Sequence, residues 1–171
     1  MSSDWVQEVY QNLKSAGISQ MCYVPDAGHG KLIKLCEADN AMHSVSLTTE
    51  EEGIAMLGGA WLGGAKGVLL MQSSGVGNCI NMLALIQECR MPLLAIITMR
   101  GEWGEFNPWQ CPMGQSTTQA LENSGVFVQR VDAAEQMPET VHAASLLAFN
   151  ANRAVAVLVS QKILGIKNFN K

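Results

Sequence analysis

Three consecutive glutamates, Glu50, Glu51 and Glu52, stand at the start of an expected helix, directly after two threonines. Threonine oxygens can accept from the free amides of a first turn, and the helix dipole favours acids there. Residues 53–65 then carry no charged side chain and include five glycines. A helix that is apolar on all sides is a buried helix, so at least one carboxylate is expected to point inward, where it needs a partner.

Helical spacing leaves open which glutamate this is. Glu51 shares a helix face with Leu62, and Glu50 shares one with Trp61 almost as well. A first turn with all three acids in solvent is the alternative.

A second polar cluster, residues 26–29, follows an expected strand. Proline, aspartate and glycine are turn formers, so turn chemistry alone could explain Asp26. A histidine titrates near neutrality, so His29 could donate to an anionic substrate or shuttle a proton. An exposed histidine without a role fits the sequence as well.

Two further clusters follow later strands. Residues 72–78 contain two serines and two glycines at a helix start, which could cradle an anion with backbone amides or simply pack tightly. They match neither a P-loop nor a dinucleotide fingerprint. The loop from 99 to about 114 is too long and too rich in tryptophan for a bare connection, and we favour a lid or subunit contact over catalysis. Arg100 could still help to neutralise a doubly anionic substrate.

Helical and strand patterns alternate along the chain. Helices are expected at 4–16, 30–38, 48–61, 75–89, 115–123 and 133–150, and strands at 21–24, 43–47, 67–71, 93–98, 126–131 and 154–160. This order predicts a three-layer α/β/α fold with a roughly six-stranded parallel sheet. Ligands bind beyond the carboxyl ends of such strands, so the four polar clusters should converge on one edge.

Composition favours one ordinary soluble domain. The chain has 171 residues, a net charge of −4 and 48% apolar residues, so we expect neither nucleic acid nor a membrane as a partner. No basic segment precedes an apolar run, and a cytoplasmic location is expected. The five cysteines show no short paired spacing, which argues against a disulfide framework and a zinc site and predicts buried thiols in a reducing compartment.

The run Glu51-Glu52-Gly53, with Trp61 ten positions after its first residue, and the string Gly-Val-Leu-Leu-Met-Gln-Ser-Ser-Gly-Val-Gly-Asn at 67–78 carry a resemblance. They resemble the pyrimidine-binding domain of thiamine-diphosphate-dependent 2-oxoacid decarboxylases. Within that group the chain is most similar to the alpha subunits of sulfopyruvate decarboxylases and less to phosphonopyruvate decarboxylases. The resemblance covers nearly the whole chain and implies one such domain over residues 1–171 with the thiamine-diphosphate-binding fold.

The resemblance also implies site residues. The family's catalytic glutamate falls on Glu51, which would hydrogen-bond to N1′ of the cofactor's aminopyrimidine ring. Ser74 and Asn78 are expected to bind the cofactor with it. The expected substrate contacts are Asp26, His29, Gln72, Ser73 and Arg100.

The implied reaction is decarboxylation of 3-sulfopyruvate to sulfoacetaldehyde and carbon dioxide, within sulfonate metabolism such as coenzyme M biosynthesis. A subunit acting on phosphonopyruvate or another 2-oxoacid is the nearest alternative. A non-catalytic, flavodoxin-like anion-binding module is a competing class, and a structural or regulatory subunit is a third, because fold does not fix function.

The family holds the diphosphate through Mg²⁺ with a Gly-Asp-Gly motif and a downstream asparagine. None of the four aspartates here, Asp4, Asp26, Asp39 and Asp132, lies between glycines. We therefore expect no metal ligand in this chain, and a beta subunit that carries the diphosphate-binding domain and Mg²⁺. Activity would need a hetero-oligomer such as α2β2 or larger.

Overall fold

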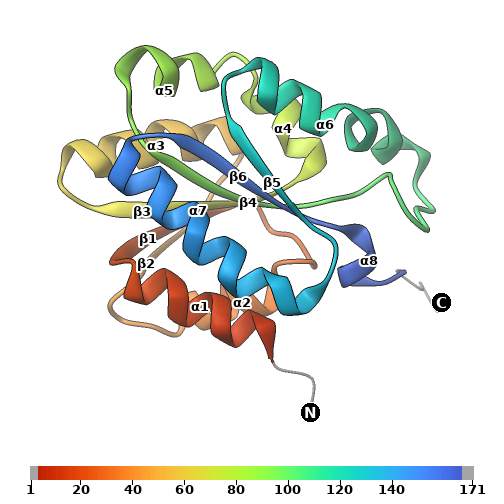
Figure 1. Cartoon of the computed structure of the whole chain (residues 1–171), viewed down its shortest axis with the longest axis horizontal. Helices are drawn as coiled ribbons and strands as arrows, with labels where there is room; N and C mark the ends of the chain where they lie inside the picture. The colour runs from red at the N-terminus through yellow and green to blue at the C-terminus, as the bar shows by residue number, and fades with distance from the viewer. Residues whose placement is uncertain (1–3, 167–171) are drawn as a thin grey trace.

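The computed structural model describes residues 4–166 and shows a parallel sheet between two layers of helices (Figure 1). The strands are β1 Ile18–Tyr23, β2 His43–Ser46, β3 Lys66–Gln72, β4 Leu93–Thr98, β5 Phe127–Val131 and β6 Ala154–Val159. Their order across the sheet is β2-β1-β3-β4-β6-β5, and every neighbouring pair is parallel. The predicted fold class and strand number are confirmed.

Within the described residues the helices are α1 Trp5–Ser15, α2 Gly30–Glu37, α3 Glu50–Leu62, α4 Ser73–Cys79, α5 Leu83–Cys89, α6 Cys111–Asn123, α7 Met137–Ala151 and α8 Gln161–Leu164, with short 3₁₀ turns at Pro108–Gln110 and Ala134–Gln136. Helices α1, α2 and α7 pack on one face of the sheet, and α3, α4, α5 and α6 pack on the other (Figure 1). Strand β3 shows why both faces are covered. Val68 and Leu70 belong to the first core, and Leu69 and Met71 to the second.

Helix α3 fits closely against β3 because of a glycine. A Cβ at Gly53 would lie 2.5 Å from a methyl carbon of Leu69 and 2.8 Å from one of Leu47. At the helix start the carboxylate of Glu52 accepts from the backbone amides of Thr48 and Thr49 at 2.9 and 3.5 Å. Glycine and cap together fix where the glutamate turn lies on the sheet.

Some sequence predictions were wrong in detail, and the first strand begins at Ile18 rather than 21. The single helix expected at 75–89 is two helices, because the amides of Ala84 and Leu85 bond to carbonyls three residues back and residues 80–82 form a turn. Helix α6 begins at Cys111 rather than 115, with Pro112 in its first turn. The cysteines are all free, but only Cys22, Cys36 and Cys79 are buried, whereas Cys89 is exposed and Cys111 is half-buried.

Candidate active site at the carboxyl edge of the sheet

The turn after β1 is tied to the ends of β3 and β4. Asp26 is buried, and its carboxylate accepts from the Gln72 amide at 2.8 Å and from the Thr98 hydroxyl at 2.6 Å. Neighbouring strands therefore present these side chains to one another, as expected for turns at one sheet edge.

His29, in the same turn, is buried rather than exposed. Its Nε2 lies 3.3 Å from the carbonyl oxygen of Met71. Burial lowers the pKa of His29, and the charge of Asp26 only partly opposes this. The imidazole is therefore neutral near pH 7. With Nε2 as the N–H donor to Met71, its other nitrogen is an acceptor.

The three glutamates have separate surroundings. Glu50 is the buried one, and its Oε2 accepts from the side-chain amide of Asn78 at 2.8 Å. Glu51 is half-buried at the sheet edge and accepts from the Thr49 hydroxyl at 2.5 Å. Glu52 is exposed and caps the helix. The expected inward carboxylate is thus Glu50, whereas Glu51 keeps part of its surface exposed and does not line the cavity described below.

The glycine-rich segment forms α4 and connects the other turns. The hydroxyl of buried Ser73 accepts from the backbone N–H of Arg100 at 3.0 Å. Gln72 and Asn78 bond to Asp26 and Glu50, and Ser74 is half-buried. The expected convergence of the four clusters is confirmed by these hydrogen bonds. Among residues 4–166, each of these side chains except Ser74 has a hydrogen-bond partner.

Arg100 is paired with a residue that the sequence analysis did not single out. Its Nε and Nη2 donate to the Glu105 carboxylate at 2.8 and 2.7 Å, and the two side chains are 8% and 4% exposed. Glu105 also accepts from the backbone of Gly101 and Asn107 and from the Gln161 amide. Beside the Arg100 guanidinium the pKa of Glu105 falls to about 2. The positive charge of Arg100 is therefore offset inside this chain.

A second acid, Glu102, connects the same loop to β5, the strand at one edge of the sheet. Glu102 accepts from both Nη atoms of Arg130 at 2.8 and 2.9 Å and from the backbone N–H of Gln161. The Gln161 side-chain oxygen in turn accepts from the backbone of Glu102 and Trp103. The loop is therefore held before Trp103 by the bonds of Glu102 and after it by the bonds of Glu105, although no regular element spans residues 99–107.

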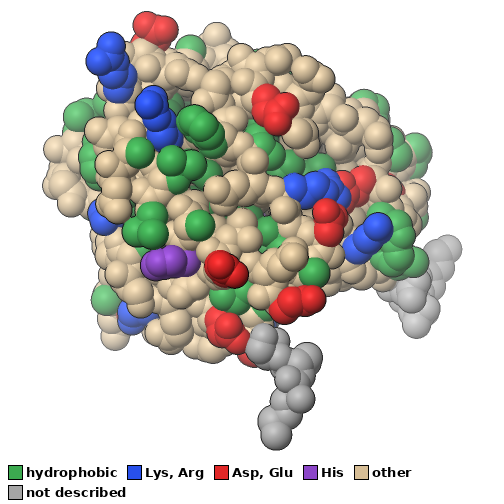
Figure 2. Space-filling view, viewed as in Figure 1, with side chains coloured by type: hydrophobic (Ala, Val, Ile, Leu, Met, Phe, Trp, Pro, Cys, Tyr) green, Lys and Arg blue, Asp and Glu red, His purple; other side chains and the backbone are tan. Residues whose placement is uncertain are grey.

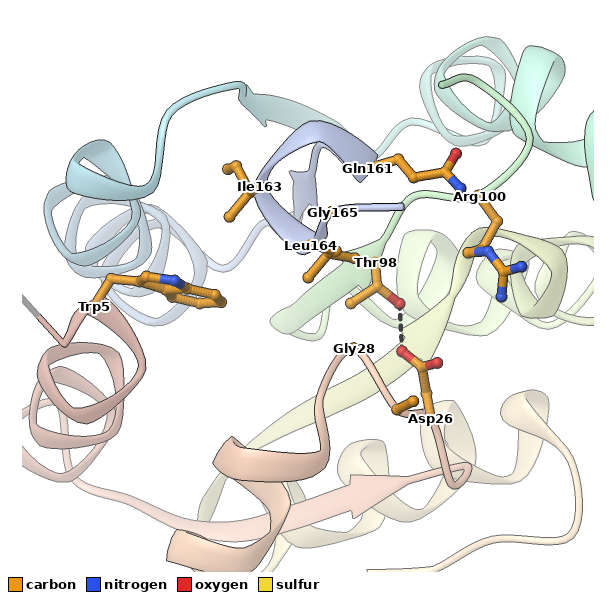
Figure 3. Close-up of a pocket in the computed structure, with 10 residues that line it drawn as sticks. Trp5, Asp26, Gly28, Thr98, Arg100, Gln161, Ile163, Leu164 and Gly165 are labelled. Atoms are coloured by element: carbon orange, nitrogen blue, oxygen red, sulfur yellow. Dashed lines mark hydrogen bonds between the residues drawn. The ribbon is translucent and has the colours of Figure 1, made fainter. Parts of the chain in front are cut away.

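A cavity of about 390 Å³ opens at this edge (Figure 3). It is lined by Trp5, Asp26, Ala27, Gly28, Thr98, Arg100, Gln161, Ile163, Leu164 and Gly165. Figure 3 shows Trp5 at one end and Arg100 at the other, with the Asp26–Thr98 hydrogen bond between them. The size suits a small ligand. Residues 4–166 contain no group of three acidic, histidine or cysteine side chains that could hold a metal ion. They also contain no helix long and apolar enough to cross a bilayer.

Similarity to known proteins decides the family. The chain is 32% identical to the sulfopyruvate decarboxylase alpha subunit of Methanothermobacter thermautotrophicus over 93% of its own length and 97% of the relative's. It is 34% identical to the alpha subunits of Methanocaldococcus jannaschii and Methanococcus maripaludis, over 88% and 90% of this chain and 89% and 92% of theirs. The chain belongs to the sulfopyruvate decarboxylase alpha-subunit family. No family model matches it.

More distant relatives cover less. A phosphonopyruvate decarboxylase of Streptomyces viridochromogenes is 34% identical over 67% of this alpha-subunit chain and 30% of its own length. Among solved structures, a 2-oxoglutarate:ferredoxin oxidoreductase from Magnetococcus marinus matches with a TM-score of 0.72, 16% identity, 92% of this chain and 29% of that one. A protein from Mycobacterium smegmatis described as a putative thiamin diphosphate-dependent enzyme matches with a TM-score of 0.70 and 17% identity. The match covers 98% of this chain and 33% of that one. These two structures support the fold.

Proposed function

We propose that this chain is the alpha subunit of a thiamine-diphosphate-dependent decarboxylase that converts 3-sulfopyruvate to sulfoacetaldehyde and carbon dioxide. The observation that carries this is the identity of 32–34% with three alpha subunits along about nine-tenths of the chain. The phosphonopyruvate decarboxylases make that substrate the second candidate, but they match only about two-thirds of the chain.

The residues present fit one end of the cofactor. Thiamine diphosphate, when bound, accepts the electron pair that carbon dioxide leaves behind. Glu51 is the residue that we assign to the pyrimidine nitrogen N1′, where it would hold or transfer a proton. Two observations support this assignment: its carboxylate lies half-buried at the sheet edge, and the Thr49 hydroxyl orients it with one hydrogen bond. Ser74 and the outward side of Asn78 are the further contacts that we assign to the cofactor.

The diphosphate end has no matching site in the described chain. Mg²⁺ takes hard oxygen ligands and usually bridges to phosphates through one or two carboxylates. Residues 4–166 bring no three candidate ligands together, and no aspartate of the sequence lies between glycines. We therefore propose a beta subunit that supplies the Mg²⁺ and diphosphate site, in an α2β2 or larger assembly. The five free cysteines of this chain fit the proposed cytoplasmic location of the assembly.

Exposed aromatic residues support a partner. Trp103, Phe106 and Trp109 are 40%, 55% and 85% exposed on a loop that two acids hold in place. Figure 2 shows hydrophobic and charged side chains together at the end of the molecule where this loop lies. Exposed tryptophan and phenylalanine side chains are enriched in protein interfaces.

The substrate contacts are also proposals. Asp26 and Arg100 line the cavity, whereas Gln72 bonds to the Asp26 carboxylate and Ser73 bonds to the backbone N–H of Arg100. His29 does not line that cavity. We propose that it acts on the substrate site indirectly, by holding the turn that carries Asp26 against the Met71 carbonyl oxygen.

The test is to assay this chain alone, and reconstituted with the beta subunit, on 3-sulfopyruvate, phosphonopyruvate and pyruvate in parallel. We expect activity only in the complex, with 3-sulfopyruvate preferred over pyruvate, because a site built to pair an anion penalises a substrate that lacks it. Robust activity of the chain alone would refute the split site, and equal efficiency on pyruvate would refute the substrate.

A further inference from the structure

Glu50 lies next to the proposed catalytic glutamate, and the family resemblance assigns it no role. Its residue is 8% exposed, so its carboxylate needs a partner, and the Asn78 side-chain amide provides one at 2.8 Å. Asn78 itself lies at the surface. The hydrogen bond therefore runs from the interior to the edge at which Glu51 lies.

The chemistry of the pair fixes the orientation of the asparagine. In the hydrogen bond between them the Asn78 NH₂ donates and Oε2 of Glu50 accepts, so the NH₂ of the amide is turned toward Glu50. Its carbonyl oxygen then faces the exposed side. A ligand at this edge meets an oriented acceptor rather than an amide that is free to flip.

Helix α4 closes on the same carboxylate from a second direction. A Cβ at Gly75 would lie 2.4 Å from both the carboxyl carbon and Oε1 of Glu50, closer than real contacts allow. The first turns of α3 and α4 therefore approach each other with Glu50 between them. Both carboxylates also act on one thiol, because burial first, and then the charges of Glu50 and Glu51, raise the pKa of Cys79 to about 12.

We propose that Glu50 is a positioning residue: its carboxylate sets the orientation of Asn78 and the spacing of α3 and α4, and thereby the place of Glu51. This rests on the proposed function, in which Glu51 and Asn78 contact the cofactor. A misplacement of a catalytic group by about 1 Å can cost about 100-fold in rate. The Glu50–Asn78 hydrogen bond, one residue from Glu51, can therefore affect the rate through the position of Glu51.

A reversal of the hydrogen bond tests the proposal. Asn78→Asp sets two carboxylates against each other, and Glu50→Gln with Asn78→Asp restores the bond with donor and acceptor exchanged. We expect Asn78→Asp to raise the Kd of the assembled complex for thiamine diphosphate about 10- to 100-fold. The double variant should recover most of that loss. Glu50→Gln alone keeps an acceptor oxygen for Asn78 and should stay within about threefold of wild type.

Glu52→Gln is the matched control, because it removes the same charge from the same turn and glutamine still serves in the helix cap. It should leave the Kd unchanged. The proposal is overturned if Asn78→Asp binds cofactor normally, or if the double variant binds no better than Asn78→Asp.

A second readout separates this from a failure of the proposed function. The thermal unfolding midpoint of the full chain should fall in Asn78→Asp and return in the double variant. If the wild-type complex binds no thiamine diphosphate, the proposed function fails, and the midpoints alone then decide whether Glu50 positions Asn78. An unchanged unfolding midpoint in Asn78→Asp would also overturn the proposal that the Glu50–Asn78 hydrogen bond positions these helices.

Discussion

Replacing Glu105 with glutamine removes one negative charge from the base of the aromatic loop and keeps the size of the side chain. The carboxylate of Glu105 is the counter-charge of Arg100, and both side chains are almost fully buried. Removing one partner of a buried pair is costly, because the other is left without its counter-charge. Two backbone amides and the Gln161 side chain would also lose a charged acceptor.

The pKa of Glu105 sets the magnitude. The Arg100 guanidinium, ahead of the other hydrogen bonds, lowers it from 4.5 to about 2. A carboxyl group whose pKa is lower in the folded state stabilises that state above its unfolded pKa. The contribution is therefore complete above about pH 4.5 and is lost as the pH falls toward 2. At pH 7 it amounts to about 3 kcal/mol.

The assay is urea unfolding of the full chain at pH 7 and pH 3, followed by tryptophan fluorescence. The free energy of unfolding of Glu105→Gln should be about 3 kcal/mol below that of wild type at pH 7. This difference in unfolding free energy should be smaller by about 2 kcal/mol at pH 3. Glu122→Gln, at an exposed position of α6, is the control and should match wild type at both pH values. A gap that is equal at pH 7 and pH 3 would refute the ion pair as the source of stability.

Three other substitutions test separate parts of the structure. Glu51→Gln should lower turnover of the assembled enzyme by about 10²–10⁴-fold with an unchanged unfolding curve, because an amide cannot exchange the N1′ proton; near-normal turnover would assign that role to a neighbouring glutamate. Trp109→Ala should leave the free energy of unfolding within about 0.5 kcal/mol, since the residue is 85% exposed, and should weaken association with the beta subunit about 30-fold by calorimetry. Unaltered association would exclude Trp109 from the interface. Gly114→Ala places a Cβ 2.0 Å from the carbonyl oxygen of Arg100 and should cost about 1–3 kcal/mol in urea unfolding. A variant as stable as wild type would show that α6 can move away from the loop.

The sheet could be predicted from sequence because its central strands are buried on both faces. All six residues of β4 and of β6 are buried, so each reads as an unbroken apolar run. Helix boundaries were harder, since single hydrogen bonds decide them. The break at residues 80–82 depends on two amides that bond three residues back rather than four.

The division of roles among the glutamates could not be predicted from spacing. Helix α3 is apolar on most of its surface, so periodicity does not separate Glu50 from Glu51. What separates them is Asn78, 28 residues away, and the absence of a side chain at Gly75. Glu105 was missed for the same reason, because its partners come from the folded loop and from Gln161 in α8. Tertiary partners decide such sites.

The charges at the cavity bear on the proposed division of the site between two chains. Arg100 is the basic residue that lines the cavity, and its charge is already matched by Glu105. Asp26 lines the same space, and Glu50 and Glu51 lie at the same sheet edge. The described residues therefore give this edge more negative than positive charge, which does not favour the approach of a dianion. If the proposed substrate is 3-sulfopyruvate, we expect part of the positive charge that draws in its carboxylate and sulfonate to come from the proposed beta subunit and its Mg²⁺. The alpha chain would then supply the carboxylate that handles the proton and a preformed surface on which the cationic half of the site is assembled.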